Sequence, residues 1–370
     1  MPGDMSLTAQ VALIAVVDSN PVFRNEVAQA LISLYRVHQY SDTRQALQAL
    51  RLEAPAVILV DEEADSKGGF QFIAEMKRDP VLAAIPAIVT TKRDPLSIAQ
   101  AMRQCGADSS LTKPFRRSAL IRTITSLVNK HVEADWEHLP ERDKTTLKGT
   151  VSVFNEISDF IAAGEPVPFT SVKEACAPLI DAIASNDFKG ILSGVKEHDN
   201  YSYAHSLRVA TLLSLFGHTL GLKHDDQLVL ASGGLLHDAG KISIPHEVLN
   251  KPGRLSEDEF LIMKSHVTET IKFLEVAHDI PKPVIIIAAQ HHEKLDGSGY
   301  PFNLKGAELN DLARMASIVD VFSALTDRRV YKPPMEAETA LAIMTGEMSH
   351  HLDQHFLAMF REMLMDAVVD

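Results

Sequence analysis

An apolar run that ends in two metal-ligating residue types is the feature that most constrains this chain. Aliphatic residues from Leu228 to Leu236 predict one face of a core helix, and His237 and Asp238 follow directly. Continuing that helix buries an imidazole and a carboxylate, which is costly unless they are paired, hydrogen-bonded or bound to a metal. Lys241 would share the helix face of Asp238, from which it could hold a phosphate. Taken alone, the dipeptide is explained more simply as a buried hydrogen-bonded pair.

Length, composition and charge set outer bounds on the class of protein. At 370 residues the chain is too long for one core, so two domains and a linker are expected. We find no apolar run that spans a bilayer and no signal peptide. Only Cys105 and Cys176 are present, which indicates a reducing cytoplasm. The net charge of -13 argues against nucleic-acid or membrane partners.

The first 130 residues alternate apolar runs with helix-like segments. Short apolar runs, typical of strands covered on both faces, occupy residues 11–17, 56–60 and 87–89, with a weaker one at 109–112. Helical segments lie between them, at residues 21–34, 43–52 and 95–105. This alternation predicts an α/β doubly wound parallel sheet. In such a sheet, polar residues at the carboxyl ends of the strands converge on one crevice.

Four residues near these strand ends resemble the phosphorylation site of a response-regulator receiver domain. Asp18, Asp61, Thr91 and Lys113 follow the order of that family's acid, phospho-acceptor, switch hydroxyl and lysine. The resemblance covers residues 10–130 and implies phosphorylation of Asp61, with Mg²⁺ and Lys113 neutralising the phosphoryl group. A sensor histidine kinase is the implied partner. Ser19 stands where the family has a second acid, so a degenerate receiver kept for dimerisation or docking is the alternative.

Three regions are expected: a receiver-like domain over 1–130, a helical linker over 131–180 and a second domain over 181–370. Within the linker, apolar residues at helical spacing precede a break at Gly164-Glu165-Pro166. The linker suits either a dimer contact, giving a homodimer, or a solvated spacer. The last region reads as nearly all helix and predicts an all-α bundle.

Thirteen of the sixteen histidines follow Lys196. Seven imidazole and carboxyl residues lie on or beside apolar helix stretches of this half: His205, His237, Asp238, His266, His291, His292 and Asp320. Each alone could be a core residue with a hydrogen-bond partner. Together they need partners in one core, and the simplest common partner is a metal. Imidazole with carboxylate suits Fe, Mn, Zn or Ni.

With the loop Asp296-Gly297-Ser298-Gly299-Tyr300-Pro301, this ordered set closely resembles the HD-GYP family over about residues 186–332. The resemblance implies an HD-type helical fold, two divalent metals of Fe or Mn type and hydrolysis of cyclic di-GMP. It implies that Asp238 bridges the metals, with His205, His237 and Asp320 toward one and His266, His291 and His292 toward the other. It further implies that Asp238 and Lys241 are catalytic and that Lys241, Tyr300, Arg329 and Lys332 contact the nucleotide.

Three positions depart from the family pattern. Tyr201 replaces a glutamate that serves a third metal in some members, so we expect two metals. Ser323 replaces an aspartate and Thr270 a glycine. Two other functions remain open: a weak or inactive signalling adaptor that docks partners, such as a diguanylate cyclase-type protein, and a general nucleotide phosphohydrolase on the same metal core.

Overall fold

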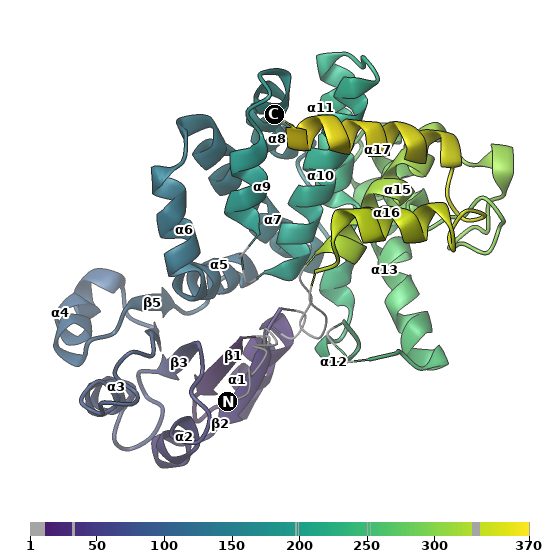
Figure 1. Cartoon of the computed structure of the whole chain (residues 1–370). Helices are drawn as coiled ribbons and strands as arrows, with labels where there is room; N and C mark the ends of the chain where they lie inside the picture. The colour runs from purple at the N-terminus through teal and green to yellow at the C-terminus, as the bar shows by residue number, and fades with distance from the viewer. Residues whose placement is uncertain are drawn as a thin grey trace, which may run out of the picture. The chain divides into compact units, whose positions relative to one another are not determined.

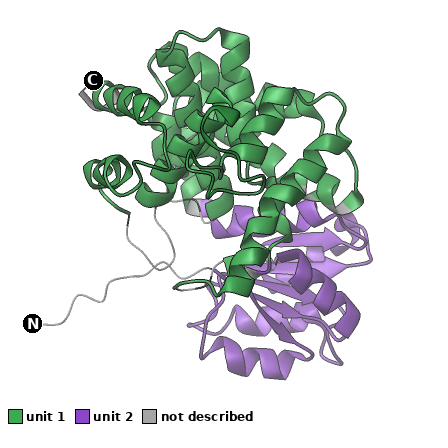
Figure 2. Ribbon diagram, turned by 90° about the vertical axis from the view of Figure 1, so that its right-hand side faces the viewer, with its two compact units in different colours: residues 1–9, 132–244, 248–370 green, residues 10–131, 245–247 purple. Residues whose placement is uncertain are grey.

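The computed structural model describes residues 12–31, 34–196, 198, 200–249, 251, 253–327 and 334–369. The described residues form two compact units (Figure 2). Those up to His131, with residues 245–247, make up the first. Those from Val132 to Ile244 and from Val248 onward make up the second.

A five-stranded parallel sheet forms the centre of the first unit (Figure 1). Its strands are β1 (Leu13–Val17), β2 (Arg36–Tyr40), β3 (Val57–Asp61), β4 (Ala87–Thr91) and β5 (Ser109–Thr112), in the order β2-β1-β3-β4-β5. The helices between and after them are α1 (Pro21–Leu31), α2 (Thr43–Leu50), α3 (Gly69–Met76), α4 (Pro95–Cys105) and α5 (Arg117–Val128). Residues of α1 and α5 share one core cluster with the sheet, and residues of α2 and α3 share the other. The predicted doubly wound sheet is therefore confirmed.

The order of the strands fixes where the first unit gathers its polar residues. The order in which the chain adds strands reverses between β1 and β3, because β2 lies on one side of β1 and β4 lies on the other side of β3. Ligand sites of such sheets lie at this switch point, outside the carboxyl ends of the strands. Asp18 follows β1 and Asp61 ends β3, so both lie at that position.

The second unit is built from helices in the described residues. The α-helices from residue 130 onward are α6 (Lys130–Asp135), α7 (Glu141–Ala163), α8 (Phe169–Ala184), α9 (Lys189–Val195), α10 (Tyr201–Thr219), α11 (His224–Leu236), α12 (His246–Leu249), α13 (Glu257–Val276), α14 (Lys282–Gln290), α15 (Asp311–Thr326), α16 (Ala337–Thr345) and α17 (Gln354–Val369). One hydrophobic core runs through it. Among the described helices, none is long and apolar enough to cross a membrane.

Residues 131–180, the expected linker, contribute to that core. Leu147 of α7 and Leu179 of α8 are fully buried in the same cluster as Leu207 of α10. The predicted break is present, since α7 ends at Gly164 with a left-handed backbone (φ 65°). Apolar spacing predicted the helix, but it carried no information about which partner would cover the apolar face.

Candidate metal centre

The His237–Asp238 pair lies at the end of α11. The helix stops at Leu236, and Asp238 has a non-helical backbone (φ −107°, ψ 12°) before a 3₁₀ turn over Ala239–Ser243. The expectation that Asp238 continues the core helix is therefore wrong. Lys241 still meets Asp238 and forms an ion pair with it, because side chains three residues apart are eclipsed in a 3₁₀ turn.

Close packing of the 3₁₀ turn against α13 brings His266 to Asp238. A Cβ at Gly240 would lie 2.1 Å from the His266 carbonyl oxygen, so only glycine allows this approach. The Gly240 amide donates to Thr270 Oγ1 (2.8 Å), and that hydroxyl donates to the His266 carbonyl (2.8 Å). Thr270, a departure from the family pattern, thus ties the two elements together.

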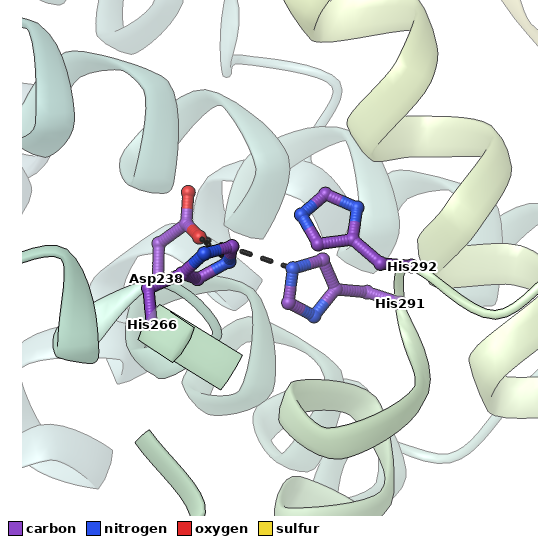
Figure 3. Close-up of side chains that lie close together, drawn as sticks. All are labelled: Asp238, His266, His291 and His292. Carbon is purple, nitrogen blue, oxygen red and sulfur yellow. Dashed lines mark ion pairs between the residues drawn. The ribbon is translucent and has the colours of Figure 1, made fainter. Parts of the chain in front are cut away.

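The two oxygens of Asp238 face different histidines. Oδ2 lies 3.2 Å from His237 Nε2 and 3.8 Å from His205 Nε2. Oδ1 lies 3.2 Å from His266 Nε2 and 3.8 Å from His291 Nε2, and Figure 3 shows Asp238 and His266 facing the His291–His292 pair. Asp238 therefore stands between two groups of imidazoles, as a bridging carboxylate must.

Asp320 and His292 complete the cluster. Asp320 Oδ1 is 2.9 Å from His205 Nε2, and its Oδ2 is 3.7 Å from His292 Nδ1. The structure thus brings all seven predicted ligands together, although Asp320 faces His292 as well as the group to which the resemblance assigns it. His291 and His292 follow the last residue of α14, and their rings are 4.0 Å apart. Adjacent residues inside a helix would point about 100° apart.

Backbone carbonyls fix the orientation of three imidazoles. Nδ1 of His237, His266 and His291 lies 2.7, 2.6 and 2.9 Å from the carbonyls of Gly234, Met263 and Ala288. A carbonyl only accepts, so each Nδ1 carries the proton, and in the neutral ring Nε2 keeps its lone pair. All three Nε2 atoms face Asp238. This is the arrangement of metal-binding histidines, whose other nitrogen donates to a neighbouring oxygen.

The donor atoms at the centre of the cluster lack other partners. Within the described residues, Nε2 of His237, His266 and His291 and Oδ1 of Asp238 are buried without a hydrogen bond. Each such atom costs about 1–3 kcal/mol. A shared cation satisfies all of them at once, and the cluster contains two candidate ligand groups, Asp238–His266–His291–His292 and His205–His237–Asp238. The residues present therefore fit a divalent metal centre.

Burial and charge shift the pKa values of these groups in opposite directions. Burial lowers the pKa of His292 to about 3, and burial with repulsion from His292 and His237 places the pKa of His291 well below its usual range. For His237 the Asp238 charge outweighs burial and raises the pKa to about 10. Charges on His237 and Lys241 likewise outweigh burial and keep the pKa of Asp238 well below normal. The carboxylate of Asp238 is therefore charged and the imidazoles of His291 and His292 are neutral, which are the protonation states of metal ligands, whereas Asp238 keeps His237 protonated in the metal-free cluster.

Asp327, which the sequence analysis did not identify, orients His205. Its Oδ2 lies 2.9 Å from His205 Nδ1, and its Oδ1 pairs with Arg208 (2.5 Å). A carboxylate behind a ligand histidine fixes the ring and raises its basicity. Its position at the end of α15, seven residues after Asp320 and therefore about two turns along the same face, was the available signal.

Glu293, also missed, anchors the loop that follows the histidine pair. It is fully buried, and its two oxygens accept from the amides of Phe302 (2.6 Å) and Leu304 (2.9 Å). A Cβ at Gly299 would lie 2.5 Å from the Glu293 Cα, so glycine is required there too. An acidic residue directly after two buried-looking histidines was the only sequence signal.

The predicted substrate contacts lie partly within the described residues. The Tyr300 ring is 4.8 Å from the His292 ring, and burial raises the pKa of its hydroxyl, which therefore stays protonated. Lys241 stands at the edge of the cluster on Asp238. Arg329 and Lys332 lie outside the described residues.

Two departures from the family pattern have clear positions. The Tyr201 ring stacks on His205 at 5.8 Å, next to the ligand cluster. Ser323 is fully buried, and within the described residues its Oγ has no hydrogen-bond partner. Nothing in the structure explains the serine.

The predicted receiver residues gather at the switch point of the sheet. Lys113 Nζ lies 2.9 Å from Asp18 Oδ2 and 2.6 Å from Asp61 Oδ2. Thr90 donates to Asp61 (3.1 Å), whereas Thr91, the predicted switch hydroxyl, donates to Glu62 (2.7 Å). The threonines alternate because successive strand residues point to opposite faces.

Comparison with known proteins identifies both units. A family model for the response regulator receiver domain matches residues 14–125, and one for the HD domain matches residues 192–356. The chain is a receiver–HD domain protein. The HD match spans α10 to α15 and the segments between them, and it includes all seven predicted ligand residues.

Two relatives are similar to this receiver–HD protein over regions of different length. The cyclic di-GMP phosphodiesterase response regulator RpfG of Xanthomonas campestris pv. campestris is 28% identical over 356 residues, covering 95% of this chain and 88% of that protein. The 3′3′-cGAMP-specific phosphodiesterase 1 of Vibrio cholerae serotype O1 is 39% identical over 155 residues, covering 42% of this chain and 36% of that protein. The chain therefore spans most of the first relative and about a third of the second.

A solved structure shares the fold. Bd1817, an HDG"Y"P protein from Bdellovibrio bacteriovorus, matches with a TM-score of 0.51 over 67% of this chain and 80% of that chain, at 19% identity.

Proposed function

We propose that this protein is a response regulator whose HD domain hydrolyses the phosphodiester bonds of cyclic di-GMP with two divalent cations, Fe or Mn. The observation that carries the proposal is Asp238, whose two oxygens face separate pairs of histidine Nε2 atoms. The relative that spans most of the chain is a cyclic di-GMP phosphodiesterase response regulator, and it supports the substrate.

The seven ligand residues would hold the metals, with Asp238 between them. Bound divalent cations supply Lewis acidity and a nucleophile at neutral pH for an in-line displacement. Asp327 and the carbonyls of Gly234, Met263 and Ala288 hold the imidazoles in place. The protein's rigid shell therefore provides preorganisation before any substrate arrives.

Four charged or aromatic residues would position the substrate. Lys241 pairs with Asp238 and would turn to a phosphate once cations neutralise that carboxylate. Tyr300, beside His292, offers a ring on which a base could stack and a protonated hydroxyl that could donate. Arg329 is suited to bidentate contact with a phosphate, and Lys332 would act as a point charge.

Metal content and turnover, measured together on anaerobically purified protein, test the proposal. We expect two Fe or Mn ions per chain and hydrolysis of cyclic di-GMP to a linear dinucleotide or mononucleotides. Asp238→Ala should lose both metal and turnover, since it removes the bridging ligand. The matched control is Asp225→Ala, an exposed residue in the first turn of α11. Turnover retained by Asp238→Ala would overturn the bridging role.

Competing functions are separated by substrate. Faster hydrolysis of 3′3′-cGAMP than of cyclic di-GMP would indicate that the substrate is the one named for the Vibrio relative. Preferential turnover of deoxynucleoside triphosphates would indicate a general nucleotide phosphohydrolase. A metal-loaded protein without activity on any of these would favour the adaptor function.

For the receiver domain we propose phosphorylation of Asp61 by a histidine kinase. Asp18 would hold Mg²⁺, and Lys113, already in contact with both carboxylates, would neutralise the phosphoryl oxygens. Incubation with acetyl phosphate and Mg²⁺ should label the wild type and leave Asp61→Asn unlabelled.

A further inference from the structure

A second pair of adjacent histidines meets an aspartate outside the proposed catalytic cluster. His350 and His351 lie in the turn between α16 and α17, and their rings are 4.0 Å apart at 51°. The His291–His292 rings show nearly the same geometry, 4.0 Å and 45°. Ligand atoms of His350, His351 and Asp296 all lie within 4.8 Å of one another.

Local hydrogen bonds already place the aspartate for binding. Asp296 Oδ1 accepts from the Ser298 amide (2.9 Å) and hydroxyl (2.7 Å). These bonds leave Oδ2 directed at His351, 3.6 Å from its Nε2. That distance is too long for a hydrogen bond, yet two ligands of one cation are commonly about this far apart, since metal–ligand bonds are about 2 Å.

The two segments are also joined through their backbones. The Leu295 amide donates to the His351 carbonyl (2.9 Å), and the His351 amide donates to Met348 (2.9 Å). Arg314 links Gly306 to Asp353 on the other side. The three ligand residues therefore stand on connected, hydrogen-bonded turns, which lowers the cost of ordering them around an ion.

Exposure and nearby charge determine how tightly this site could hold an ion. Side chains of Asp296 and His351 are 32% and 21% exposed, which leaves room for water as a further ligand. Lys294 repels a cation, and the site has three ligand residues. We therefore expect it to bind Zn²⁺ more weakly than the seven-residue cluster binds its metals.

We propose that Asp296, His350 and His351 bind one Zn²⁺ ion and that this ion tethers the Tyr300-bearing loop to the turn between α16 and α17. Imidazole and carboxylate ligands with a water at the remaining position suit Zn²⁺. The site is independent of the catalytic cluster, and it remains a site whether or not that cluster is catalytic.

Zn²⁺ stoichiometry after equilibrium dialysis tests the proposal. Wild-type protein should bind one more Zn²⁺ per chain than His350→Gln/His351→Gln. His355→Gln, an exposed histidine just beyond the turn, should bind as the wild type does. Equal stoichiometry in the wild type and the double variant would overturn the site.

Two further variants keep the outcome interpretable. Asp296→Asn keeps an acceptor for Ser298 while removing the charge, so it should weaken Zn²⁺ binding without unfolding the loop. His266→Gln/His291→Gln should retain the peripheral ion even if the catalytic proposal fails. Zn²⁺ should also slow hydrogen exchange at residues 294–306 in the wild type and in His355→Gln, and less in Asp296→Asn; equal protection in Asp296→Asn would refute the tether.

Discussion

At the scale of single residues, we expect Asp327 to position His205 and not to bind the metal itself. Asp327→Asn keeps the size but loses the carboxylate that holds His205 Nδ1 and pairs with Arg208. We expect a loss of about 10–100-fold in metal affinity or turnover. Metal titration followed by cyclic di-GMP turnover measures it, with Asp225→Asn as the exposed control. If excess metal restores full turnover, the carboxylate acts through metal retention alone.

The pKa values of His292 and His237 predict how the metal-free protein responds to pH. An unfolded histidine titrates near 6.5, whereas folded His292 has a pKa of about 3, so between these values the unfolded chain binds more protons and acid destabilises the fold. His237, with a pKa of about 10, acts oppositely: its contribution to stability is lost as pH rises from about 6.5 to 10.

Urea unfolding in a chelator at a series of pH values checks this. The midpoint should be highest near neutral pH and fall on both sides, and His292→Gln should flatten the acid side. A midpoint that stays constant from pH 4 to 6.5 in the wild type would contradict the buried, neutral His292.

At the scale of elements, the approach of α13 to the 3₁₀ turn depends on Gly240. Gly240→Ala would place a methyl 2.1 Å from the His266 carbonyl, forcing the elements apart. We expect a stability loss of about 1–3 kcal/mol or more and weakened metal binding. Gly149→Ala is the matched control: its nearest neighbour would be 3.8 Å away, so a helix-interior alanine should stabilise by about 0.5–1 kcal/mol. Thermal unfolding compares the two, and equal stability would refute the close approach.

The sequence predicted elements best where their burial is complete. β1, β3 and β4 are buried throughout and read as apolar runs, whereas β2 (Arg36–Tyr40) was missed, because at the sheet edge it is only partly buried and lacks such a run. At the start of α13, the side chain of Ser256 and that of Glu259 form a capping box, a pattern that is local in the sequence.

Site residues followed the same physical logic. The seven predicted ligands could be recognised in the sequence because they lie on or beside apolar helices, where polar side chains need partners. Asp327 contacts a residue 122 positions away and Glu293 contacts residues about 10 positions away, and the weak sequence signals at these two positions did not identify the partners. Which of Thr90 and Thr91 faces Asp61 depends on the pleat of β4, and the composition of the strand does not reveal it.

At the scale of the whole molecule, a second acidic residue beside Asp18 should raise the Mg²⁺ affinity of the receiver domain. Ser19 is exposed at the end of β1, so Ser19→Asp adds a carboxylate to the Mg²⁺ site with little structural cost. We expect Mg²⁺ affinity to rise on the order of tenfold, about 1.4 kcal/mol. The rate at which acetyl phosphate labels Asp61 at limiting Mg²⁺ measures the effect. An unchanged rate would mean that Asp18 and Lys113 alone determine it.

One peptide bond joins a proposed metal ligand to the residue that anchors the loop. His292 faces Asp320, and Glu293 holds the amides of Phe302 and Leu304. If the proposed ions bind here, a nucleotide that moves the loop would also disturb His292, and the electron paramagnetic resonance spectrum of bound Mn²⁺ would change when substrate binds. The ion proposed for catalysis would then serve as a spectroscopic probe of substrate binding.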